Sequence, residues 1–182
     1  MLIDLTLEVT PAMISAVQGH EPKAFHGHLG THFDVMDEEF PLAYTARPGI
    51  VFDVRGQEEI SLTAADLARI DADMFVLFHT GHIAYGYGTE QYRHNHPQLS
   101  AGLIEALVSR NVSVIGIDAP GVRRGREHTP ADQYCADHDM FIVENMCHLE
   151  QLPQDRPFLV RTFPVRFAGQ SGLPCRVIAE TE

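Results

Sequence analysis

The sequence predicts a single α/β domain with a mixed sheet over residues 1–182. A chain of this length corresponds to about one domain and is long enough to bury a core without metal or disulfide staples. Short apolar runs alternate along it with helical patterns. Residues 100–118 read as a helix that leads into a fully apolar strand, which is typical of a strand covered on both faces in an α/β layer.

Apolar runs predict the strands. They cover residues 2–7, 50–54, 74–78, 112–117 and 140–143, followed by 158–167 and 176–179 as a closing pair around a turn at 169–172. The segments 8–49 and 79–99 lack clear periodicity and hold most of the histidines. Long irregular stretches in a compact domain tend to be functional loops, so we expect the site to draw on these two segments.

Three segments have the start signals of helices. Thr63 precedes a capping-box-like start, which predicts a helix to about residue 70. Ser100 precedes a helix whose apolar residues share one face, with Asn111 as its stop. Pro130 opens a third, short helix that runs through Asp137.

Charge and composition exclude several classes of protein. Lys+Arg 13 against Asp+Glu 25 gives a net charge of −12, and without a basic run this disfavours nucleic acid or an anionic membrane surface as a partner. No apolar window approaches the roughly 18–20 residues of a membrane span. The first ten residues carry Asp4 and Glu8 where a signal peptide needs a basic start, and the three cysteines suit reduced thiols. We therefore expect a cytoplasmic protein.

The eleven histidines include a cluster in which His28, His32 and Asp34 have even spacing. A straight strand would put the two histidines about 13 Å apart, too far to share one ion. Gly27 and Gly30 disfavour a helix there. The remaining geometry is a bend at Gly30 that folds the imidazoles toward each other. The spacing alone leaves two interpretations open, a partial metal site or a histidine-rich surface loop.

The stretch His28-Leu-Gly-Thr-His-Phe-Asp34 resembles the H-x-G-T-H-x-D signature of the cyclase family of metal-dependent hydrolases, whose best-known members are the bacterial kynurenine formamidases. Residues 3–6, 96–100, 115–120 and 142–145 are similar to further family segments. The resemblance implies the family's swivelling β/β/α-type fold and a homo-oligomer, a dimer or tetramer. It also implies one or two divalent ions and an activated water that attacks an amide or ester carbonyl.

The resemblance assigns site residues one by one. It implies that His28 and His32 bind the first metal and that Asp34 and Glu144 bridge two metals. Two positions depart from the family pattern, and both hold a carboxylate in place of a histidine. Glu38 stands at the position of the acid/base histidine. Asp132 stands at that of the remaining histidine ligand.

These departures change the expected chemistry. An oxygen-rich site suits Mn²⁺ or Mg²⁺ better than an imidazole-rich one does, so manganese joins zinc as a candidate ion. Without an ion, the clustered carboxylates would repel one another and take up protons. Glu38 is either the general base toward the activated water or a direct ligand. His128 is the reserve ligand if Asp132 does not complete the site.

Arg123, with Arg124 and Arg126 beside it, follows the turn where the resemblance places the pocket mouth. It is either a clamp for a substrate carboxylate or part of a solvated basic loop. His82, like His79, follows a predicted strand and either lines the pocket or has a structural role. We take Arg123, His82 and His128 as the candidates for substrate binding. The cysteines are expected to be small buried hydrophobes.

Together these observations predict a metal-dependent hydrolase that acts on a C–N bond, or an ester, of a small amide or cyclic amide. Kynurenine formamidase itself is not expected, because Glu38 replaces the acid/base histidine. Two alternatives remain: a metal- or small-ligand-binding protein without catalysis, and a lactone hydrolase or dehydratase on the same site. The expected partners are a small-molecule substrate and further copies of the chain.

Overall fold

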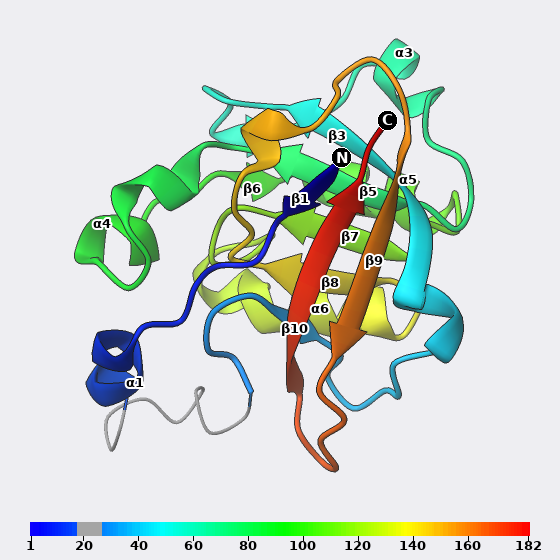
Figure 1. Cartoon of the computed structure of the whole chain (residues 1–182). Coiled ribbons are helices and arrows are strands. Elements are labelled where there is room, and N and C mark those ends of the chain that lie inside the picture. The colour runs from blue at the N-terminus through cyan, green and yellow to red at the C-terminus, as the bar shows by residue number, and fades with distance from the viewer. Residues whose placement is uncertain (18–26) are drawn as a thin grey trace.

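The computed structural model describes residues 1–17 and 27–182 (Figure 1). Its strands are β1 (Leu2–Asp4), β2 (His32–Asp34), β3 (Ala46–Asp53), β4 (Glu59–Ile60), β5 (Phe75–His79), β6 (Gln98–Leu99), β7 (Val114–Ile117), β8 (Phe141–Glu144), β9 (Phe158–Pro164) and β10 (Gly172–Glu180). Its α-helices are α1 (Pro11–Val17), α3 (Ala64–Leu67), α4 (Glu90–Arg93), α5 (Ala101–Val108) and α6 (His128–Ala136). Short 3-10 helices are η1 (Leu42–Thr45), η2 (His82–Tyr85), η3 (Gly125–Glu127) and η4 (Leu149–Gln151).

The main sheet is mixed, as predicted. Its strand order is β1-β10-β2-β8-β7-β5-β3-β9. Strands β3, β5, β7 and β8 are parallel neighbours, whereas β2 runs antiparallel to both β8 and β10. Because β9 pairs with both β3 and β10, the sheet closes on itself into a barrel-like core.

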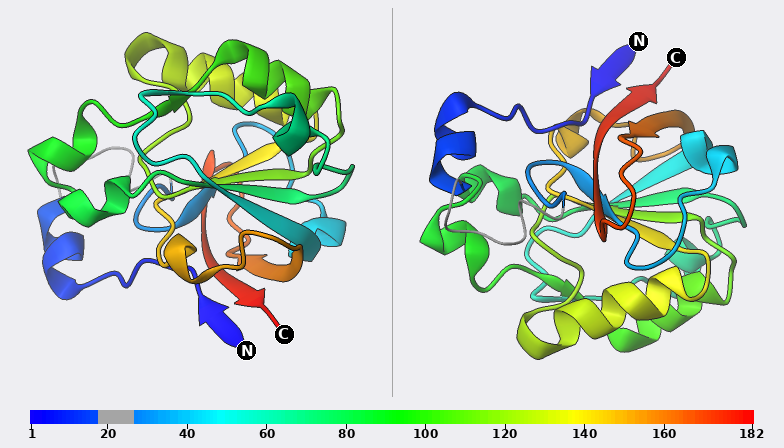
Figure 2. Two further views of the ribbon diagram at one scale, coloured as in Figure 1. Left: turned by 90° about the horizontal axis from the view of Figure 1, so that it is seen from above. Right: turned by 90° about the horizontal axis from the view of Figure 1, so that it is seen from below.

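Alternate residues of the parallel strands fill two separate cores. One core includes Val51, Phe75 and Phe141 and lies against the antiparallel strands. The other contains residues of opposite parity, such as Ile50 and Val76, together with the apolar residues of α5. Helices α5 and α6 lie together on one side of the sheet (Figure 2). This double burial explains why the parallel strands are apolar throughout.

The predicted strands are all present, with bounds shifted by a few residues. The first ends at Asp4, although the Leu5 amide still donates to Val177. The last strand begins at Gly172, earlier than predicted, because Gly172–Pro174 pair with β2 before Cys175 begins the pairing with β9. Among the described residues, no helix is long and apolar enough to cross a membrane.

The predicted helix caps at Thr63 and Ser100 are confirmed. Thr63 forms a complete capping box with Asp66, but that helix ends at Leu67, so the predicted extension to residue 70 was wrong. Ser100 accepts from the Leu103 amide, and Asn111 adopts a left-handed φ of 55° just after α5.

The third predicted helix begins earlier than expected. Helix α6 starts at His128, not at Pro130, and ends at Ala136. A proline is tolerated in the first turn of a helix because its missing N–H has no partner within the helix there. The two extra residues matter for the site, because they place His128 and Asp132 one helical turn apart.

Candidate metal centre

The predicted bend at Gly30 is confirmed. Gly30 has a φ of +70°, a conformation that glycine adopts without strain, and a Cβ there would lie 2.7 Å from a methyl carbon of Val9. The bend brings Nδ1 of His28 to 3.1 Å from Nε2 of His32. The centroids of the two imidazole rings lie 4.8 Å apart. The histidines therefore face the same small volume.

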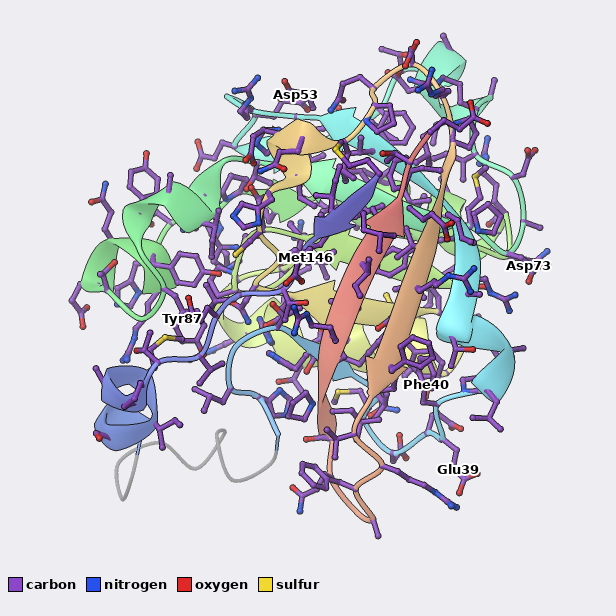
Figure 3. The ribbon with its side chains drawn as sticks, in the orientation of Figure 1. Glu39, Phe40, Asp53, Asp73, Tyr87 and Met146 are labelled. Carbon is purple, nitrogen blue, oxygen red and sulfur yellow. The ribbon has the colours of Figure 1, made fainter. Side chains whose placement is uncertain are left out.

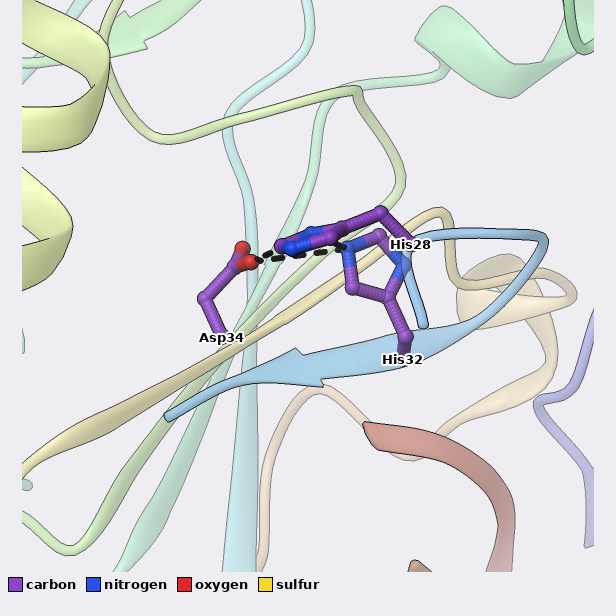
Figure 4. Close-up of side chains that lie close together, drawn as sticks. All are labelled: His28, His32 and Asp34. Atoms are coloured by element: carbon purple, nitrogen blue, oxygen red, sulfur yellow. Dashed lines mark hydrogen bonds and ion pairs between the residues drawn. The ribbon is translucent and has the colours of Figure 1, made fainter. Parts of the chain in front are cut away.

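Strand β2 then adds the first carboxylate. His32 and Asp34 lie two residues apart on this strand and share a face. Oδ1 of Asp34 lies 2.9 Å from Nδ1 of His28 and 3.6 Å from Nε2 of His32 (Figure 4). All three residues offer ligand atoms within 4.8 Å of one another, a spacing that allows them to hold one metal ion.

The second carboxylate comes from β8, far away in the sequence. The register of the antiparallel pair β2–β8 sets Glu144 directly opposite His32. Oε2 of Glu144 lies 3.7 Å from Nε2 of His32. The expected convergence of Asp34 and Glu144 is therefore present, and the pairing of β2 with β8 produces it.

A second group of ligand atoms meets at Glu144. His128 and Asp132 lie at positions i and i+4 of α6, with Nε2 of His128 at 3.3 Å from Oδ2 of Asp132. The same imidazole nitrogen lies 3.5 Å from Oε1 of Glu144. The three residues form a second candidate metal group. His128 and Asp132, which the sequence left as alternatives, are thus both present at the site.

The electrostatics favour an ionised Asp34. Burial alone would raise the pKa of its carboxyl, but the charge of His32 and hydrogen bonds from His28 and His32 outweigh burial and hold the pKa well below its usual range. Its Oδ2 is buried and has no hydrogen-bond partner among the described residues. A buried carboxylate oxygen with an unused lone pair beside imidazole nitrogens fits a divalent ion, because such N/O sets suit Zn²⁺ and Mn²⁺.

A cavity of about 710 Å³ opens onto both groups. His28, His32, His128 and Glu144 lie in its lining. Helix α1 contributes Ala12 and Met13 to the wall, and the segment around α4 contributes Tyr87, Thr89, Tyr92, Arg93 and His96. In Figure 3, Tyr87 lies between α4 and α1, two elements that contribute to the cavity wall.

The candidate base Glu38 lies elsewhere. Its side chain is exposed and groups with the exposed carboxylates of Asp37 and Asp137. Among the described residues that line the cavity, Glu38 is absent. Val35, Met36 and Asp37 separate Glu38 from β2, and the Glu38 amide donates to the Val35 carbonyl, so the chain turns after Asp34. Its proposed acid/base role therefore has no support from position.

Two substrate-binding candidates also lie outside the described cavity lining. Arg123 donates to Glu127 and, at 2.7 Å, to the carbonyl of Leu99, so its guanidinium ties η3 to β6. His82 is buried, and its Nε2 donates to the carbonyl of Tyr92 at 2.8 Å. These contacts favour a structural role, and not substrate binding, for both Arg123 and His82.

Sequence reasoning missed the aromatic wall of the cavity. Tyr87, Tyr92 and His96 lie in the segment 79–99, which shows no period because short turns and one-turn helices make it up. Spacing offered no signal for them. In the folded protein only 1% of the surface of Tyr92 and 4% of that of His96 is exposed. This burial depends on tertiary packing, which the spacing of residues does not reveal.

Comparison with known proteins identifies the family of the chain and its fold. The model of a family described as "Putative cyclase" matches residues 3–124, and the chain belongs to this family. None of the curated proteins matches the chain. The solved structure of a potential metal-dependent hydrolase with cyclase activity is similar, with 21% identity, a TM-score of 0.75 and coverage of 98% of this chain and 96% of that one.

Two further solved structures share the fold. A predicted metal-dependent hydrolase from Bacillus stearothermophilus has 21% identity and a TM-score of 0.74, covering 98% of this chain and 97% of that one. Isatin hydrolase A from Ralstonia solanacearum has 20% identity and a TM-score of 0.75, covering 98% of this chain and 91% of that one. The α/β fold with a mixed, closed sheet is therefore that of the cyclase family.

Proposed function

We propose that this protein is a metal-dependent hydrolase that cleaves a C–N bond of a small amide or cyclic amide. The observation that carries the proposal is the meeting of two His/carboxylate groups at Glu144, in the lining of one cavity. Membership of the putative cyclase family and the likeness to structures named as hydrolases support the reaction class.

His28, His32 and Asp34 would hold one ion, and His128, Asp132 and Glu144 would hold a second. Glu144 has one oxygen near His32 and the other near His128, which suits a carboxylate shared between two ions. A divalent ion bound there supplies a Lewis acid and makes a neighbouring water more acidic. With three imidazoles and three carboxylates, the donor set suits zinc and manganese alike.

His96 is a better-placed candidate for the proton acceptor than Glu38, which does not line the cavity. His96 lines the cavity, and its Nδ1 lies 3.0 Å from the carbonyl of Pro97. A carbonyl only accepts, so Nδ1 carries the proton and Nε2 keeps a lone pair. That lone pair suits a hydrogen bond from a water or from a substrate N–H, and Glu38 stays the alternative that the family pattern suggests.

Turnover of a panel of small amides, cyclic amides and esters tests the proposal. The protein is freed of metal with a chelator and reloaded with Mn²⁺ or Zn²⁺. Asp34→Asn is compared with Asp37→Asn, which changes an exposed carboxylate three residues further along the chain. Activity that depends on metal and is lost only in Asp34→Asn is expected. Metal binding without turnover of any panel member would instead favour the non-catalytic binding protein, and turnover of lactones alone would favour the lactone hydrolase.

A further inference from the structure

Two tyrosines of the segment 82–93 are linked to the bend that joins His28 to His32, Tyr87 directly and Tyr92 through Asn145. The first is Tyr92 on α4, whose hydroxyl donates to Oδ1 of Asn145 at 2.6 Å. Burial, and then the nearby charge of Glu144, raise the pKa of Tyr92, so this hydroxyl stays a donor. Because Oδ1 of Asn145 accepts, the orientation of the amide is fixed, and its Nδ2 donates to the carbonyl of Gly30 at 3.0 Å.

The carbonyl of Gly30 also determines the state of His32. Nδ1 of His32 lies 2.9 Å from this carbonyl and must donate to it, since a carbonyl oxygen only accepts. In the neutral ring, His32 therefore carries its proton on Nδ1, and the lone pair of Nε2 faces Asp34 and Glu144. This is the tautomer that a ligand to a metal ion between those carboxylates requires.

The second tyrosine contacts the other side of the bend. The amide of Gly30 donates to the hydroxyl oxygen of Tyr87 at 3.0 Å. The rings of Tyr87 and Tyr92 lie 5.7 Å apart, and His82 ties the backbone of Tyr92 in place at 2.8 Å. The segment 82–93 thus holds the N–H of Gly30 directly, through Tyr87. It holds the carbonyl of Gly30 indirectly, through Tyr92 and Asn145.

We infer that Tyr92, assisted by Tyr87, is a positioning residue of the metal centre: through Asn145 it holds the Gly30 carbonyl and so sets the tautomer of His32 and its approach to His28. The inference rests on the proposed function, because it concerns how well the same histidines bind a metal. Since both tyrosines also line the cavity, a molecule bound there contacts the residues that support the ligands.

The test is the affinity of the folded protein for Mn²⁺ and for Zn²⁺, measured by calorimetry on Tyr92→Phe, Tyr87→Phe and Tyr85→Phe. Tyr85 belongs to the same segment but is half exposed, and it serves as the matched control. Loss of an outer hydrogen bond that orients a ligand typically weakens metal binding about 10- to 100-fold. We expect a loss of this size in Tyr92→Phe, a smaller loss in Tyr87→Phe, where water can replace the hydroxyl, and none in Tyr85→Phe.

A metal affinity of folded Tyr92→Phe within about twofold of the wild type would overturn the inference. If Tyr92→Phe does not fold, Tyr87→Phe decides: weakened binding supports the inference, and unchanged binding overturns it. If the wild type itself binds neither ion, the proposed function fails, and the ¹⁵N spectrum of His32 in the metal-free protein still tests the positioning. The wild type should show the proton on Nδ1, and Tyr92→Phe a mixture of tautomers; an unchanged spectrum would refute the positioning.

Discussion

Replacing His96 with glutamine is expected to make the protein less sensitive to acid. Burial, followed by repulsion from His82, His128 and Arg124, lowers the pKa of His96 from 6.5 to about 4 in the folded state. As the pH falls, the His96 imidazole is therefore protonated in the unfolded chain at a higher pH than in the folded protein. The associated stability is present above pH 6.5 and is lost as the pH falls from 6.5 toward 4.

The size of this effect follows from the shift. A depression of the pKa from 6.5 to about 4 corresponds to about 3 kcal/mol, at about 1.4 kcal/mol for each pH unit. Urea unfolding of the wild type and of His96→Gln at pH 7 and pH 4 measures it. The drop in unfolding free energy between the two pH values should be smaller by about this amount in the variant.

His94→Gln is the matched control, since His94 is two residues away and largely exposed. It should keep the acid sensitivity of the wild type. An NMR titration of the folded protein gives an independent check, with the His96 ring expected to titrate near pH 4. A ring that titrates near 6.5, or equal pH dependence in wild type and His96→Gln, would refute the reasoning.

Three further predictions concern the scaffold. Gly116→Ala should lower the unfolding free energy by about 1–3 kcal/mol, because its Cβ would lie 2.6 Å from both Met146 Sδ and Phe75 Cε2; an unchanged urea midpoint would contradict this packing. Thr63→Ala should cost about 1 kcal/mol through loss of the capping box, measured the same way, and Ser61→Ala serves as its control. Thiol reagents at pH 8 should leave the native protein unmodified, and fast labelling would contradict the burial that raises the pKa of Cys135 to about 12, of Cys147 to about 11 and of Cys175 to about 12.

Much of the fold was predictable because its signals are local. The apolar runs at 50–54 and 74–78 are buried on both faces, so periodicity and composition identify them as strands. The helix cap at Ser100 depends on a hydrogen bond three residues away. The bend at Gly30 follows from excluding a strand and a helix, and the structure confirms it.

The parts that sequence could not predict depend on long-range pairing. Strand β2 has three residues, too few for a period, and only its register with β8 sets His32 opposite Glu144. Helix α6 begins two residues earlier than predicted, at His128, and this start places His128 beside Asp132. The helix propensities of His128 and Thr129 do not predict the earlier start. The exposed position of Glu38 depends on the path of the loop after β2.

The most direct test of the account is the metal content and metal affinity of the purified protein. Elemental analysis after purification without chelator, followed by titration of the metal-free protein with Mn²⁺ or Zn²⁺, should show one or two ions per chain. Asp34→Asn should lose this uptake while it remains folded, and Asp37→Asn should retain it. A folded wild-type protein that contains no divalent metal and takes up neither ion would contradict the account.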